Sequence, residues 1–131
     1  MKKTLALIVF ALVLVPVFAF GAQMEGTIQG YNCVTQGKVC PIGKEDPVAA
    51  VERVFVLYTD NKDFYFIPNV DRIVLGRHIA EKVRVTGEKN PMFKSITATK
   101  IEVWRKGSWK ETWSDESEKE IRKMLGIEPG L

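Results

Sequence analysis

Two cysteines are the residues whose chemistry is most constrained by their spacing. Cys33 and Cys40 are the only cysteines of the chain, and six residues separate them. In an oxidising compartment two cysteines most simply pair, and this short loop would contribute about 2–3 kcal/mol on the chain-entropy account. Metal or haem ligation needs more donors, and neither Cys-x-x-Cys nor Cys-x-x-Cys-His is present. We expect a Cys33–Cys40 disulfide, no metal site and no cofactor. A redox-active or metal-handling cysteine pair is the alternative.

The single histidine is the next candidate for chemistry. His78 could serve as a general base only beside a partner or a nucleophile, and no sequence pattern supplies either. Its place at the end of an expected helix instead predicts that it caps the last carbonyl groups of that helix. We therefore assign no catalytic residue and interpret the protein as a non-enzyme.

Aromatic side chains provide a second kind of chemistry, the stacking of flat ligands. If Tyr65 faces outward beside Tyr58 and Lys62, the two tyrosines form a stacking platform of the kind that binds sugars or single strands. The alternative is ordinary packing between neighbouring strands. Trp104 and Trp109 lie in a basic, aromatic tail that either binds a ligand or closes one end of the β domain. These four residues are the candidate ligand-binding residues.

The first 22 residues carry the pattern of a secretory signal peptide. Lys2 and Lys3 precede an uncharged apolar run that ends before Pro16, and small residues follow. Cleavage after Ala19, Gly21 or Ala22 fits this pattern. The alternative is an uncleaved membrane anchor, because residues 4–22 are long enough to span a bilayer. We expect a periplasmic or secreted protein.

Charge and length limit the partners of the exported part. The whole chain has 19 basic and 16 acidic residues, but without Lys2 and Lys3 the balance is 17 to 16. A net charge of +1 predicts no polyanion-binding surface, so no nucleic-acid partner is expected. Membrane contact is expected only through an uncleaved signal segment. About 109 residues remain after the signal, which is the size of one domain.

Hydrophobic alternation and turn residues predict the elements that must position these side chains. A strand with a bend at Gly26 or Gly30 is followed by a long loop with a short helical turn from Pro47 to Val51. The expected strands are 24–32, 53–59, 64–67, 82–88 and 95–104, with a further short strand at 108–113. The strand at 95–104 alternates only if its register shifts near Thr99 and Lys100.

Two helices complete the pattern. The first is expected at 70–77 with Asn69 as its N-cap, and the second at 114–125 with Gly126 as its stop. A short helix between the third and fourth of five strands is the order of an OB-fold, a small Greek-key barrel. We therefore predict residues 23–113 as a mainly β, five-stranded OB-fold-like domain and 114–131 as a C-terminal helix and tail.

A family resemblance rests on Val83-Arg-Val-Thr-Gly-Glu88 and on the preceding Leu75-Gly-Arg-His-Ile79. These residues resemble small exported bacterial OB-fold proteins, in which a helix leads into a V-x-V-x-G strand and a hairpin follows. The resemblance covers about residues 26–104 and implies a fold more than an activity. The chain departs from that pattern at Cys33 and Cys40 and in its tryptophan-rich tail, so no ligand is carried over.

Together these patterns predict a non-enzymatic exported binding module. Its partner would be a small ligand, a glycan or an envelope protein held on the face of the β domain. The alternative is a redox or metal-handling periplasmic protein that uses Cys33 and Cys40.

Overall fold

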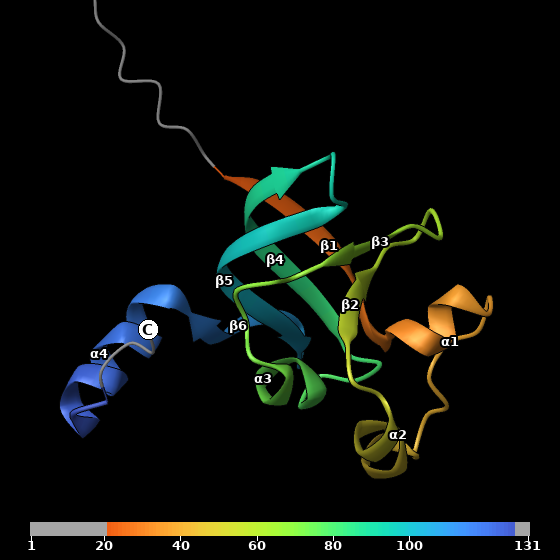
Figure 1. The fold of residues 1–131 in the computed structure, drawn as a ribbon, viewed down its shortest axis with the longest axis horizontal. Coiled ribbons are helices and arrows are strands. Elements are labelled where there is room, and N and C mark those ends of the chain that lie inside the picture. Colours follow the sequence, from red (N-terminus) through yellow and green to blue (C-terminus); the bar gives the residue numbers. More distant parts are fainter. Residues whose placement is uncertain (1–20, 128–131) are drawn as a thin grey trace, which may run out of the picture.

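One six-stranded sheet, in the order β3-β2-β1-β4-β5-β6, forms the body of the molecule (Figure 1). The structure is a computed structural model, and it describes residues 21–127. The strands are β1 Ala22–Gly30, β2 Phe55–Tyr58, β3 Phe64–Phe66, β4 Lys82–Asn90, β5 Ser95–Arg105 and β6 Ser108–Ser114. The helices are α1 Tyr31–Thr35, α2 Glu45–Val51, α3 Arg72–Gly76 and α4 Asp115–Leu125.

Five of the strands close into a ring, because β3 at one end of the order also pairs with β5. The pairing is parallel and joins Phe66 to Ser95. The Phe66 N–H donates to the Lys94 carbonyl at 2.8 Å. Just beyond β3, the Asn69 side chain exchanges two hydrogen bonds with the backbone of Ala98, at 2.7 and 2.8 Å. An amide side chain thus continues the strand pairing where β3 itself has ended.

Two close backbone approaches explain the glycines within this ring. β1 pairs with β4 up to Thr27 and with β2 from Thr27 onward. At Gly26 a Cβ atom would lie 2.3 Å from the Tyr58 carbonyl oxygen, and at Gly87 it would lie 2.0 Å from that of Thr97. Any side chain would therefore push the strands apart at these two points.

A β-bulge bends the hairpin between β4 and β5. Thr86 pairs with Lys100 and Gly87 with Ala98, which leaves Thr99 as the additional residue. The predicted register shift near Thr99 and Lys100 is confirmed.

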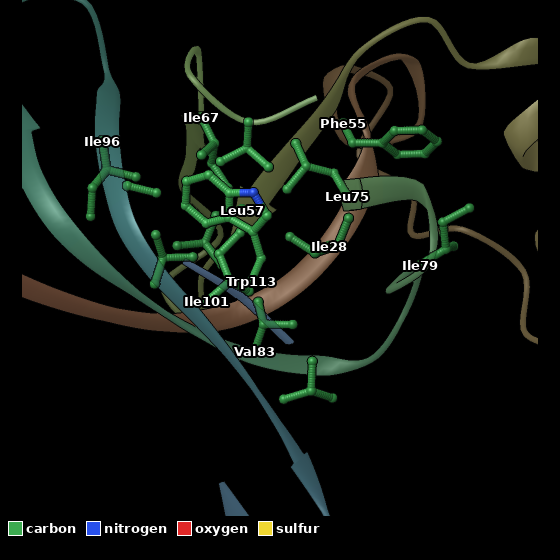
Figure 2. Close-up of a cluster of buried hydrophobic side chains, with 14 of the residues drawn as sticks. Ile28, Phe55, Leu57, Ile67, Leu75, Ile79, Val83, Ile96, Ile101 and Trp113 are labelled. Carbon is green, nitrogen blue, oxygen red and sulfur yellow. The ribbon is translucent and has the colours of Figure 1, made fainter. Parts of the chain in front are cut away.

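The core fills the inside of the ring (Figure 2). Alternating residues of β1, β2, β4 and β5 point into it, and the α3 region adds Leu75 and Ile79. The Trp113 indole from β6 lies among these side chains and is only 8% exposed. Fully buried side chains of the core include Ile28, Leu57, Val83, Val85, Ile96, Ile101 and Val103.

The mainly β architecture with an intervening short helix and a C-terminal helix is confirmed. The sheet has six strands, because the further short strand predicted at 108–113 forms β6 and pairs with β5, in addition to the five strands predicted for the OB-fold-like domain. The helix expected at 70–77 is shorter, and its N-cap is Asp71, whose carboxylate accepts from the Ile73 N–H at 2.7 Å. The side chain of Asn69 instead donates a hydrogen bond to the backbone of Ala98 in β5.

The prediction of a loop from residue 33 onward is wrong at the start of that segment, where α1 forms. The N-cap residue of α1 is Gly30, which has no side chain that could cap the helix. The cap comes instead from Glu52, twenty positions further along the chain, whose carboxylate accepts from Asn32. Local sequence gives no sign of such a distant cap. The helical turn predicted at 47–51 belongs to α2 and is confirmed.

The signal peptide and the alternative membrane anchor were assigned to residues 1–22, which lie almost entirely outside the described residues. Within residues 21–127 no helix has both the length and the apolar character needed to cross a membrane.

Candidate functional site

The outer face of β2 and β3 carries a group of aromatic side chains. Strand pairing sets their direction, because Leu57 is opposite Tyr65 and Tyr58 is opposite Phe64. Leu57 points into the core, and Tyr65 packs against that core from the same side. Phe64 and Phe66 therefore share the outer face with Tyr58. The stacking platform expected if Tyr65 faced outward beside Tyr58 does not form, since the two tyrosines point to opposite sides of the sheet.

Three rings meet on this outer face, and we call Tyr31, Phe64 and Phe66 the aromatic triad. The ring centroids of Tyr31 lie 5.7 Å from Phe64 and 5.5 Å from Phe66, and those of Phe64 and Phe66 are 5.7 Å apart. The contacts of Phe64 with Tyr31 and with Phe66 are edge-to-face, an arrangement that stabilises aromatic clusters. All three residues are only partly buried and lie outside the main core. The triad thus presents aromatic surface to solvent.

A charged pair borders the aromatic triad. The Lys94 ammonium lies 4.6 Å from the centre of the Phe64 ring and pairs with the Asp63 carboxylate. The hydrogen bond from Lys94 holds the pKa of Asp63 below its usual value. Asp63 also accepts a hydrogen bond from the Tyr65 hydroxyl at 3.2 Å. The border is therefore polar but electrically balanced.

The buried carboxylate of Glu52 positions Tyr31 within the triad. Glu52 is 3% exposed and accepts from the backbone of Asn32 and Cys33, both at 3.3 Å, and from the Asn32 amide at 3.1 Å. A carboxylate at the first turn of α1 satisfies N–H groups that have no partner within the helix. The Tyr31 N–H donates to the Val54 carbonyl at 2.9 Å. These bonds fix α1 beside β2 (Figure 1).

Cys33 and Cys40 lie next to this cap as unbonded thiols. Their sulfur atoms are 3.7 Å apart, beyond the bond length of about 2.05 Å, so the predicted disulfide is absent from this structure. Cys40 is buried, where its sulfur accepts from the Gly30 N–H at 3.0 Å and its N–H donates to Gln29 at 2.6 Å.

The setting of Cys33 disfavours its thiolate. Its sulfur lies 3.5 Å from a Glu52 carboxylate oxygen. Burial, together with the neighbouring Cys40 thiol and the Glu52 carboxylate, raises the pKa of Cys33 to about 12. Because the thiolate is the reactive form, this setting suits a stable structural pair better than rapid thiol exchange.

Trp104 and Trp109 form a separate aromatic pair on the outer side of β5 and β6. They are direct cross-strand partners with ring centroids 5.2 Å apart. The Arg84 guanidinium lies 4.4 Å from the centre of the Trp109 ring, and Trp104 is 44% exposed. Trp113, the third tryptophan of the tail, belongs to the core. The four predicted ligand-binding residues therefore do not come together in one site.

His78 is buried and pairs with a carboxylate. Its Nδ1 atom lies 3.4 Å from Glu81, which in turn accepts two hydrogen bonds from Arg105 at 2.8 and 2.7 Å. Burial lowers the pKa of His78. The imidazole therefore takes part in a structural network rather than capping helix carbonyls as predicted. Within residues 21–127 no cluster of three or more histidine, cysteine or acidic side chains has a metal-binding arrangement.

Two of the hollows in the surface of the described residues are relevant to the candidate site. A cavity of about 300 Å³ lies beside the aromatic triad and includes Phe66 in its wall. A second hollow of about 530 Å³ separates α3 from α4.

The sequence reasoning missed all three residues of the aromatic triad. The pairing of Tyr58 with Phe64 could have been inferred from the hairpin once Leu57 was assigned to the core. Nothing in the sequence brings Tyr31 to these rings.

Comparison with known proteins adds no relative to this geometry. No family model, no curated protein and no solved structure matches the chain. The candidate site consequently rests on the arrangement of the aromatic triad, its charged border and the adjoining cavity.

Proposed function

We propose that the protein is a non-enzymatic, exported module that binds a glycan on the outer face of β2 and β3. The observation that carries this proposal is the aromatic triad, three partly exposed rings whose centroids lie 5.5–5.7 Å apart. Flat aromatic rings stack on the apolar face of a sugar ring, and the neighbouring polar groups bind its hydroxyls.

The ring of five strands supports an OB-fold, which we propose as the fold. Its order β1-β2-β3-β5-β4 and the placement of α3 between β3 and β4 agree with that assignment. OB-folds bind oligosaccharides and oligonucleotides through the face of strands 2 and 3 and the loops 1–2 and 4–5. Here Phe64 and Phe66 belong to strand 3, Tyr31 begins the 1–2 connection, and Lys94 ends the 4–5 loop.

Charge favours a glycan over an oligonucleotide. Proteins that bind single strands combine stacking rings with a positively charged groove that follows the phosphates. Lys94 is neutralised by Asp63, and Lys62 is accompanied by Asp60 in the same turn. Arg53 and Arg72 are confined to one neighbouring cavity and do not form a groove along which a phosphate backbone could run. Among the described residues, the hydroxyls of Tyr31 and Tyr58 have no protein partner, whereas that of Tyr65 is bound by Asp63. Free hydroxyls beside stacking rings suit a ligand that is rich in hydroxyl groups.

The cysteines support a structural role within this module, and we propose that they form a disulfide after export by exchange with an external disulfide, which takes up the two electrons and two protons and leaves as two thiols. The sulfur atoms are already adjacent, and burial raises the pKa of Cys33 to about 12. A redox-active cysteine needs an accessible thiolate near neutral pH, so this setting argues against the redox alternative.

A glycan array with the exported protein tests the proposal. We expect binding to one glycan class, lost at least tenfold in Phe64→Ala and Phe66→Ala when the hit is followed by calorimetry. Trp104→Ala is the matched control, because it removes an exposed aromatic ring from a different face and should leave the affinity within twofold. No binding to any glycan, or loss only in the Trp104 variant, would refute the proposal. Circular dichroism of each variant verifies that the fold is intact.

A further inference from the structure

The cavity beside the aromatic triad is walled mainly by apolar side chains. It lies between the start of β2, the end of β3 and α3, and the residues that line it are Arg53, Val54, Phe55, Phe66, Ile67, Pro68, Val70, Arg72 and Leu75. Phe66 belongs to both the cavity and the aromatic triad. Val54 also joins the two, because its carbonyl accepts the Tyr31 N–H. The cavity and the aromatic triad therefore adjoin each other at Phe66.

Both ionisable side chains that line this cavity are arginines. Arg72 is held in place, since its Nε and one terminal nitrogen donate to the Glu52 carbonyl at 3.0 and 2.8 Å and it also binds the Ala49 carbonyl. Its guanidinium lies 5.6 Å from the centre of the Phe55 ring. These partners are carbonyl oxygens and a ring, so none of them neutralises its charge.

Arg53 is the freer of the two cations. It is exposed, and within residues 21–127 the structure shows no ion pair or side-chain hydrogen bond for it. The adjacent Glu52 carboxylate is buried and directed to the backbone of α1. The cavity thus carries two positive charges without a facing carboxylate.

The hollow between α3 and α4 has a different charge pattern. Its ionisable lining residues are Asp71, Arg77, Glu118 and Arg122, so both signs are present in equal number. It gives no preference for a charged ligand.

We propose that the cavity is a subsite for an anionic group, a carboxylate or a phosphate, on the glycan that stacks on the aromatic triad. The Arg53 guanidinium has paired N–H donors that can bind either anion, and Arg72, whose Nε and one terminal nitrogen already donate to carbonyl groups, adds a second positive charge. The cavity's volume of about 300 Å³ lies at the lower end of the range typical of small-ligand pockets. This subsite rests on the proposed glycan binding and narrows its ligand to acidic glycans.

Small aromatic anions test the subsite independently of the glycan. We suggest titrating ¹⁵N-labelled protein, purified after export of the full chain, with benzoate, phenyl phosphate and the neutral benzamide while recording amide chemical shifts. The anions should shift the amides of Val54, Phe55 and Phe66 and bind at least tenfold more tightly than benzamide. A response to only one of the two anions supports the subsite and identifies carboxylate or phosphate as its ligand.

Variants separate a specific subsite from general attraction to positive charge. Arg53→Gln, which removes no ion pair or side-chain hydrogen bond among residues 21–127, should weaken anion binding at least fivefold. Lys110→Gln removes an exposed positive charge from β6 and should leave it unchanged. Equal binding of benzamide and benzoate, shifts confined to other residues, or an unaffected Arg53 variant would overturn the subsite.

The glycan array distinguishes this failure from failure of the proposed function. If neutral glycans bind to the aromatic triad as tightly as their acidic counterparts, the anionic subsite is refuted and the proposed glycan-binding function is supported. If anions bind in the cavity but the protein binds no glycan on the array, the anion site is supported and the proposed glycan-binding function is refuted.

Discussion

Disulfide formation between Cys33 and Cys40 should stabilise the folded protein by a measurable amount. The bond would close a loop of eight residues, for which the chain-entropy relation gives about 2.5 kcal/mol at 25 °C. In a domain of this size, that free energy corresponds to a rise in Tm of about 10 °C. The protein purified after export should therefore melt about 10 °C higher without reductant than with it.

The structure also indicates which part moves when the bond forms. The sulfur atoms must come about 1.7 Å closer together. Cys40 is held by the Gly30 N–H and by Gln29, so Cys33 and the short helix α1 should make most of the movement. Strain from that movement would reduce the gain in Tm below the chain-entropy value.

Circular dichroism melts with and without dithiothreitol measure the stability, and maleimide labelling counts the free thiols. A double Cys33→Ser, Cys40→Ser variant is the control, because its Tm should not respond to reductant. Two freely labelled thiols in the exported protein, or equal melting temperatures in the two redox states, would show that the reasoning is wrong.

Three further predictions concern stability. Glu52→Ala should cost about 2–4 kcal/mol in urea unfolding, because the N–H groups of Asn32 and Cys33 lose their acceptor; a cost below 1 kcal/mol would contradict the proposed cap. Gly87→Ala should cost about 2 kcal/mol or more, since its Cβ would overlap the Thr97 carbonyl, and an unchanged urea midpoint would refute this. Burial lowers the pKa of His78 from 6.5, so the unfolded chain takes up a proton first as pH falls. Its stabilising contribution is complete above pH 6.5 and is lost as the pH falls below that value. His78→Gln should therefore show a smaller drop in Tm between pH 7.5 and 5 than the natural protein, and an equal drop would contradict that role.

The elements of the β domain could be predicted because their signals are local. Val83, Val85 and Gly87 alternate in a way that only a half-buried strand explains, and the interrupted alternation around Thr99 indicated the bulge. The acidic start and glycine stop of α4 likewise defined that helix from neighbouring residues.

The candidate site escaped prediction because it depends on contacts between distant residues. The cap on α1 comes from Glu52, and this cap together with the Tyr31 N–H bond to Val54 brings Tyr31 to Phe64 and Phe66. The direction of Tyr65 depended on which side of β3 faces the core, which alternation alone leaves open. Asn69 had two suitable roles, and the pairing with Ala98 took precedence over the helix cap.

A titration of the labelled protein with the glycan selected from the array tests the central claim most directly. The account predicts chemical-shift changes and protein–glycan nuclear Overhauser effects at the rings of Tyr31, Phe64 and Phe66. Glycan contacts located instead at Trp104 and Trp109, with the aromatic triad unperturbed, would contradict it.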